Sequence, residues 1–216
     1  MPDFNEGATK SVLRRVPKQE RSRGRIDEIL KVSMDLIGRK GIDAVTMKEI
    51  ATLSGGPIAS VYQYFPNKSA IVAMLYERYE EDALDIVRHH CSAIENEDHV
   101  FAAVDAMIDA YYQAVKDAPA TQDLINAIQA DKELAELDIA GSRAHSRIFV
   151  DVTAGFVADD RREHYARAAF LMFHLAASVV RLALLVDDQE GESIMAEFKA
   201  AAQLQLRQYI AVREAL

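Results

Sequence analysis

The scarcity of helix-breaking residues constrains the fold of this chain more than any other feature. Beyond residue 70 the glycines and prolines number only four, namely Pro119, Gly141, Gly155 and Gly191. Patterns of alternating apolar and polar residues, typical of half-buried strands, are absent, and apolar residues recur instead at a helical period. The sequence therefore predicts an all-α protein, with Pro119 and Gly191 at breaks. The predicted helical segments beyond residue 67 cover residues 68–95, 98–117, 121–130, 132–157, 160–187 and 192–214.

A single cysteine and the lack of a long apolar segment indicate where the protein resides. Cys91 is the only cysteine, which excludes an intrachain disulfide and favours a reducing, cytoplasmic environment. The N-terminal sequence MPDFNEGATKSVLRR lacks the apolar core of a signal peptide. The most apolar run, residues 168–180, is flanked by Arg167 and Arg181 and is shorter than the roughly 20 residues of a membrane span. We therefore expect a soluble cytoplasmic protein without a membrane partner.

The net charge of −9 is unevenly distributed along the chain. Residues 1–80 contain 13 Lys or Arg and 10 Asp or Glu, whereas residues 81–216 contain 12 and 24. The basic excess is concentrated in residues 10–40, with ten basic and four acidic side chains. A basic N-terminal segment is either a solvated tail or a surface for a polyanion such as nucleic acid, and charge alone does not decide between them.

The segment that precedes residue 67 predicts three helices in a row. A first helix over Glu20–Arg39 ends at Gly41. Residues 46–49 (Thr-Met-Lys-Glu) have the form of a capping box and start a short second helix, which residues 54–56 (Ser-Gly-Gly) stop. A third helix starts at Gly56-Pro57 and ends at Pro66. Two short helices that follow a longer supporting helix, with a glycine turn between them, predict a helix-turn-helix unit.

The third helix has an outer face suited to the major groove of DNA. Val61 and Phe65 are spaced to face inward, which leaves small or planar polar side chains, including Ser60 and Gln63, on the outside. Asn67 caps the helix that follows and places Lys68 in its first turn. Helix N-termini attract phosphate, and Thr46 and Lys68 add a hydroxyl and an ammonium group at two of them. This pattern predicts a surface for double-stranded nucleic acid.

The sequence TMKEIATLSGGPIASVYQYFPNKSAI resembles the DNA-binding signature of the TetR (tetracycline-repressor-like) family of bacterial transcriptional regulators. The Thr-led short helix, the turn, the Tyr-x-Tyr-Phe spacing and the Pro-x-Lys start of the next helix are all in register. The upstream VPKQERSRGRIDEILKVSMDLI resembles a family subset with an Arg-rich lead, so the resemblance covers roughly residues 19–75. It implies a basic tail over residues 1–18, a DNA-binding domain over 19–66 and a helical effector-binding and dimerisation domain over 67–216.

The resemblance also implies which side chains contact DNA. Gly56 stands where the family usually has Val, so the turn lacks an apolar side chain. Pro57 stands where the family usually has a Ser that caps the helix, so this side-chain cap is missing. We therefore expect the recognition helix to begin more loosely than usual. For Tyr64, which adjoins Phe65, packing between helices is the alternative. The implied contacts are Arg21, Arg23, Thr46, Lys48, Ile58, Ala59, Ser60, Tyr62, Gln63, Tyr64 and Lys68.

The remaining two-thirds of the chain carry weaker signals. In TetR-like proteins the last two long helices form the homodimer interface, and the central helices enclose an effector site. For the aromatic candidates in that site, ordinary core packing is the alternative. For the apolar stripes of the last two helices, ordinary core is likewise the alternative to an interface. The implied dimer contacts are Phe173, Ala177, Val180, Leu184, Phe198, Ala201, Ala202 and Tyr209. The candidates for the effector site are Tyr111, Tyr112, Phe149, Phe156, Phe170, Met172 and His174.

Motifs for catalysis or metal binding do not emerge from the sequence. The adjacent His89 and His90 point about 100° apart on a helix, and the sequence contains no GxSxG, P-loop or GxGxxG. We expect no enzymatic activity, cofactor or metal. The predicted function is that of a TetR-type repressor that binds a palindromic operator as a homodimer and is released by a small lipophilic effector of unknown identity. The alternatives are a helical enzyme and an all-α ligand-binding or interaction protein that has lost specific DNA binding.

Overall fold

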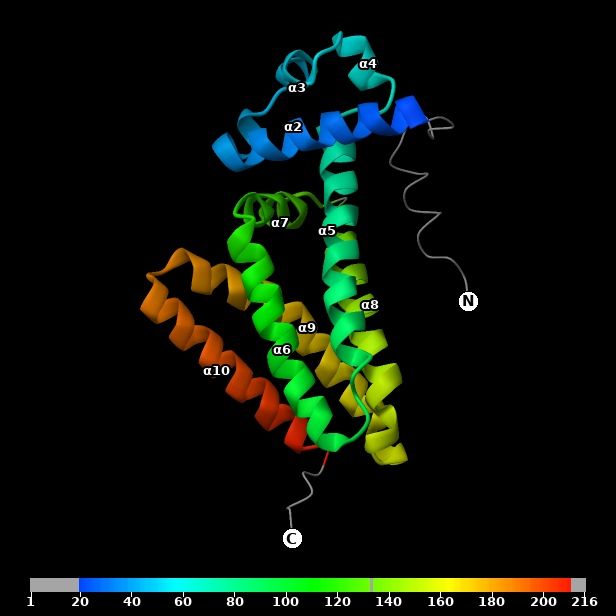
Figure 1. Ribbon diagram of the computed structural model, residues 1–216, viewed down its shortest axis with the longest axis vertical. Coiled ribbons are helices and arrows are strands. Elements are labelled where there is room, and N and C mark those ends of the chain that lie inside the picture. Colours follow the sequence, from blue (N-terminus) through cyan, green and yellow to red (C-terminus); the bar gives the residue numbers. More distant parts are fainter. Residues whose placement is uncertain (1–19, 133, 211–216) are drawn as a thin grey trace. The chain divides into compact units, whose positions relative to one another are not determined.

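The computed structural model describes residues 20–132 and 134–210 and confirms the all-α fold, because it contains helices and no strand over those residues (Figure 1). The tail predicted for residues 1–18 lies outside the described part. The helices are α2 (Glu20–Ala44), α3 (Met47–Leu53), α4 (Ile58–Tyr62), α5 (Lys68–Cys91), α6 (Glu97–Asp117), α7 (Ala120–Ala130), α8 (Ala135–Thr153), the 3-10 turns η1 (Ala154–Phe156) and η2 (Asp159–Arg161), α9 (Arg162–Leu185) and α10 (Asp188–Arg207).

The chain forms two compact units whose division differs from the predicted domains. The first unit extends to Glu80 and also includes Pro119–Asp138, and the second comprises Glu81–Ala118 and the residues from Ile139 onward. Helix α7 was expected in the C-terminal domain, but it packs with α2 in the first unit. Residue 66 therefore does not separate the units, since the first half of α5 belongs with the helix-turn-helix.

Helix α2 is the centre of the first unit. Figure 1 shows α3 and α4 on one side of α2 and α7 on the other. Gly38 permits the contact with α7, because a Cβ atom at this position would lie 2.6 Å from the Cβ atom of Ala120. The apolar face of α7, with Leu124 and Ile128, joins the core that surrounds Ile37 of α2. This close approach explains why α7 belongs to the first unit.

The local signals for helix ends in the first unit are confirmed. The Thr46 hydroxyl accepts a hydrogen bond from the Glu49 amide at 3.2 Å, and the Glu49 carboxylate accepts one from the Thr46 amide at 3.1 Å. Gly55 has φ of 74°, the left-handed value that favours glycine. The side chain of Asn67 caps α5 by accepting from the Ala70 amide at 2.8 Å. Helix α4 is shorter than expected, since it ends at Tyr62 and the chain continues to Pro66 in turns.

The second unit contains α6, α9 and α10, and Figure 1 shows α9 and α10 side by side with α6 against α10. The prediction that Gly191 breaks the helix is wrong, because Gly191 lies inside α10. A Cβ atom there would clash with the backbone carbonyl oxygen of Ala183. Gly191 is therefore a point of close approach between α9 and α10 and does not end a helix.

Candidate nucleic-acid interface

The orientation of α4 follows from two buried side chains. Val61 and Phe65 are both 0% exposed and anchor the segment to the core of the first unit. The opposite face is exposed and contains Ile58, Ala59, Tyr62 and Gln63. Pro57, the residue before α4, supplies no side-chain hydrogen bond to the helix, as its chemistry predicts. The exposed face therefore combines small, apolar and planar polar groups on one short helix.

Two of the predicted basic contacts are exposed on the preceding helices. Arg23 lies on α2 and Lys48 on α3, and both side chains are exposed. Arg21 belongs to α2, but its side chain lies outside the described part of the structure. Leu53 at the end of α3 is also exposed, and sequence reasoning missed it because a leucine at a helical spacing is normally assigned to the core.

Thr46 is exposed and participates in a hydrogen-bonded network at the start of α3. Its hydroxyl donates to Glu49 Oε2 at 2.8 Å, and Lys40 Nζ donates to Glu49 Oε1 at 2.6 Å. The hydrogen bond from Lys40, together with that from Thr46, lowers the pKa of the Glu49 carboxyl below its usual value. The Glu49 carboxylate thus stays charged beside Thr46. Its negative charge partly neutralises the positive charge of Lys40, and a phosphate at Thr46 would meet this partly neutralised surface.

Lys68 is half-buried and forms hydrogen bonds at the end of α2. Its Nζ atom donates to the carbonyl oxygen of Ile42 at 2.9 Å and to that of Asp43 at 3.5 Å. These carbonyls lie just after Gly41, where φ of 73° interrupts the helix. An ammonium group has three N–H donors, so one is left for a phosphate oxygen. Lys68 therefore closes the end of α2 whether or not it also meets DNA.

Tyr64 and Ser60 have different environments from those the DNA assignment suggests. Tyr64 is only 8% exposed and packs in the core of the first unit, which favours the alternative of packing between helices. Ser60 is half-buried, and its hydroxyl accepts a hydrogen bond from Arg25 Nε at 3.2 Å. Arg25 also donates to the carbonyl oxygen of Ser54. The space left by Gly56 is filled by the guanidinium group of Arg25, a contact that sequence reasoning missed.

Sequence profiles of known families match both parts of the chain. The profile described as "Bacterial regulatory proteins, tetR family" matches residues 29–75, and that described as "Tetracyclin repressor-like, C-terminal domain" matches residues 98–210, which is more than half of the chain. The protein belongs to the tetR family. It is therefore a transcriptional regulator with a helix-turn-helix unit for DNA binding, and the resemblance noted in its sequence is confirmed.

Individual relatives are distant, and the solved ones share the tetR-family fold. An "Uncharacterized HTH-type transcriptional regulator YvdT" from Bacillus subtilis is 24% identical over 94 residues, which span 44% of this chain and 46% of that protein. A TetR-family regulator from Streptomyces coelicolor is 22% identical with a TM-score of 0.67, covering 87% of this chain and 98% of its own. The fatty acid degradation regulator FadR from Bacillus halodurans is 15% identical with a TM-score of 0.65, covering 93% and 100%. A SmeT–triclosan complex is 16% identical with a TM-score of 0.66, covering 89% and 95%.

The predicted effector residues of this tetR-family protein lie in different packing environments. Phe149 is buried in a core of the second unit that Phe156 also joins, and Tyr111 and Tyr112 pack against a different cluster. The Phe170 ring lies 4.5 Å from the guanidinium carbon of Arg143, and the His174 ring nitrogen lies 3.1 Å from the Ser142 hydroxyl.

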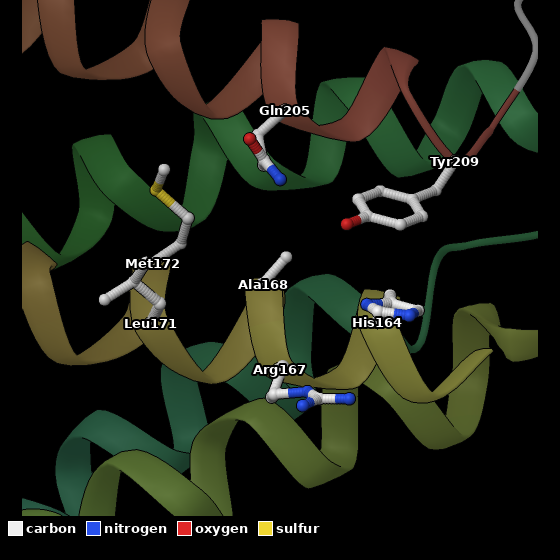
Figure 2. A pocket seen from close by; sticks show the side chains of 7 residues that line it. All are labelled: His164, Arg167, Ala168, Leu171, Met172, Gln205 and Tyr209. Atoms are coloured by element: carbon white, nitrogen blue, oxygen red, sulfur yellow. The ribbon is translucent and has the colours of Figure 1, made fainter. Parts of the chain in front are cut away.

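Met172 is the one predicted effector residue among those that line a surface groove of about 480 Å³ between α9 and the end of α10. Figure 2 shows side chains of both elements around this groove. The lining residues are His164, Arg167, Ala168, Leu171, Met172, Gln205 and Tyr209. Arg161 lies over the ring of Tyr209, with its guanidinium carbon 4.9 Å from the ring centroid. Helix α9 contributes the apolar Ala168, Leu171 and Met172 as well as His164 and Arg167, and the other side of the groove is formed by Gln205 and Tyr209.

The residues predicted for dimerisation differ in their exposure within the second unit. Val180, Phe198 and Ala202 are buried, while Phe173, Ala177, Leu184 and Tyr209 are half-buried and only Ala201 is exposed. Four exposed leucines share another side of α9 by their helical spacing, and we call them the leucine face: Leu171, Leu175, Leu182 and Leu185. Leu204 on α10 is also exposed. The segment Asp159–Leu185 is long and apolar enough to cross a membrane, and 17% of its most apolar window is buried.

Proposed function

We propose that the protein binds a palindromic DNA operator as a homodimer through the exposed face of α4. The burial of Val61 and Phe65 carries this proposal, because it directs Ile58, Ala59, Tyr62 and Gln63 outward together. The Gln63 amide both donates and accepts hydrogen bonds, as base edges in the major groove require, and Ile58 suits a thymine methyl group. Arg23 and Lys48 supply positive charge for phosphates, which position the protein without reading sequence.

The homodimer would form through the leucine face. A continuous set of exposed leucines on one helix is unusual for a surface in water, and it marks an interface. A second copy is a better partner than lipid, because the exposed Arg162, Arg167 and Arg181 on α9 are costly within a bilayer. Two-fold symmetry would then place two recognition helices about 34–36 Å apart on a duplex. On this proposal the protein is soluble and cytoplasmic.

Repression would be relieved by a small lipophilic effector bound in the helical C-terminal part. Two proteins of the same fold support this class of ligand, one solved with triclosan and one described as a fatty acid degradation regulator. The effector would favour a dimer whose recognition helices no longer match both half-sites together. A differential affinity of about 5.5 kcal/mol moves such an equilibrium from 1:99 to 99:1.

The test begins with selection of a preferred duplex from a random library by the purified full chain. We expect an inverted repeat, with an affinity that falls steeply as salt increases. Gln63→Ala should weaken binding to the selected duplex roughly five- to hundredfold and leave non-specific binding unchanged. Lys48→Ala should weaken all duplexes alike and reduce the salt slope by about one. Failure to enrich any duplex at low salt would favour a ligand-binding protein that has lost DNA recognition.

A further inference from the structure

Arg25 connects all three helices of the helix-turn-helix unit. Its side chain starts on α2 and donates from Nε to the Ser60 hydroxyl of α4 at 3.2 Å. A second guanidinium nitrogen donates to the carbonyl oxygen of Ser54, the residue that ends α3. The two acceptors lie on opposite sides of the turn between α3 and α4. One guanidinium group therefore joins the end of α3 to the recognition helix.

Gly56 is the steric complement of this guanidinium group. A Cβ atom at Gly56 would lie 2.7 Å from a terminal nitrogen of Arg25 and 3.2 Å from its guanidinium carbon. The backbone of Gly56 does not require glycine, because among the described residues only Gly41 and Gly55 have positive φ. The absence of a side chain at Gly56 is thus explained by the space that Arg25 occupies.

Helix α4 has few other contacts that fix its beginning. It is five residues long, Pro57 gives it no side-chain cap, and Val61 is its one buried residue. Phe65 holds the chain only after the helix has ended. A helix this short is not stable by itself, so its orientation depends on tertiary contacts. The hydrogen bond to Ser60 supplies such a contact at the central residue of α4.

We propose that Arg25 is a positioning residue for operator recognition, with Gly56 retained to accommodate it. Arg25 fixes the direction of the exposed face of α4 and does not itself bind DNA. This inference rests on the proposed function, since it concerns how α4 is held for base contacts. The competing role is a direct phosphate contact, which the basic character of the N-terminal segment would suggest. The two roles differ in their dependence on salt and on DNA sequence.

Binding of the full chain to the selected duplex and to an unrelated duplex distinguishes the two roles. Arg25→Met keeps the length of the side chain and removes its donors. We expect this variant to lose about tenfold in affinity for the selected duplex, with unchanged affinity for the unrelated one and an unchanged salt slope. Arg23→Met is the matched control, because this exposed arginine of the same helix should weaken both duplexes and reduce the slope by about one. An Arg25→Met variant that behaves like Arg23→Met would overturn the proposal.

A double-mutant cycle tests the link to Gly56 without depending on DNA. Gly56→Ala should lower the thermal stability of the wild-type chain, because the new methyl group displaces the guanidinium group. The same substitution in an Arg25→Ala background should cause little or no further loss. Equal losses in both backgrounds would refute the coupling. A wild-type chain that binds no duplex would refute the proposed function, while this cycle would still decide whether Arg25 and Gly56 act together.

Discussion

Glu80 offers a test of the buried polar contacts in the first unit. Burial raises the pKa of its carboxyl to about 7, the charge of Asp138 adds to the shift, and a hydrogen bond with Tyr76 partly offsets it. The Tyr76 hydroxyl also donates to Asp138 Oδ1 at 2.9 Å, and Asp138 is itself buried. Removing the charge of Glu80 should therefore stabilise the folded protein, but only at pH values at which the carboxyl is ionised.

The magnitude follows from the difference between the folded and unfolded states. The ordinary pKa of the group is 4.5, and the rise to about 7 in the folded state is worth about 3 kcal/mol at 1.36 kcal/mol per unit. Because the folded state binds the proton of Glu80 more tightly, the contribution of this group to stability is greatest below pH 4.5. That contribution is lost as the pH rises through 7. Glu80→Gln should therefore be more stable than the wild type by about 3 kcal/mol at pH 8, and by less than about 1 kcal/mol at pH 5.

Urea unfolding at pH 5 and pH 8 measures this difference. Glu28→Gln removes the same charge from an exposed position of α2 and serves as the control, for which we expect a change within about 0.5 kcal/mol at both pH values. The reasoning would be refuted if Glu80→Gln were no more stable than the wild type at pH 8, or if its advantage were the same at pH 5.

Three further predictions concern packing, capping and self-association. Gly191→Ala should lower the free energy of unfolding by about 1–3 kcal/mol in urea titrations because α9 and α10 are in contact there. Gly24→Ala should raise it by roughly 0.5–1 kcal/mol, because nothing outside the local helix backbone lies within 4 Å of the new methyl group. Equal effects of the two substitutions would contradict the packing argument. Thr46→Ala should cost about 1 kcal/mol by removal of the capping box, and an unchanged urea midpoint would show that the cap is dispensable. Leu182→Glu, at a leucine that is 52% exposed, should convert the proposed dimer to a monomer in sedimentation analysis, and Leu53→Glu, at another exposed leucine, should not. A wild-type chain that sediments as a monomer would refute the leucine face as an interface.

Features that depend on neighbours in sequence were predicted, and those that depend on distant residues were not. The capping box of Thr46 and Glu49 and the turn at Gly55 involve residues a few positions apart, so their chemistry determines them locally. The role of Gly191 depends on a carbonyl group in another helix. The contact of Arg25 with Ser60 spans 35 positions, and the sequence marks it only by a glycine without an evident backbone role.

The C-terminal helices show a second limit of sequence patterns. Helix α9 is apolar on more than one side, so its period identifies a helix without indicating which side faces the core. The sequence favoured the stripe that contains Val180, which is 1% exposed and belongs to a core cluster of the second unit. The stripe that contains Leu185, which is 69% exposed, was not selected. Only packing of the whole unit distinguishes the two stripes, and the same holds for aromatic residues such as Phe149.

The polar side chains of the helix-turn-helix divide into those that hold the helices and those that face outward. Thr46 binds Glu49, Ser60 binds Arg25, and Lys68 binds carbonyls at the end of α2, so the hydrogen bonds of these three residues position α3, α4 and α5. Ile58 on α4 and Gln63 directly after it are exposed, and on our proposal they face the duplex. The preference for a DNA sequence should therefore depend chiefly on the residues that face outward. Changes in the residues that hold the helices should instead alter the orientation of α4 as a whole. Some hydroxyl and ammonium groups lie at positions where the family usually contacts DNA. Such a group is thus weak evidence for recognition of bases when it already forms a hydrogen bond within the protein.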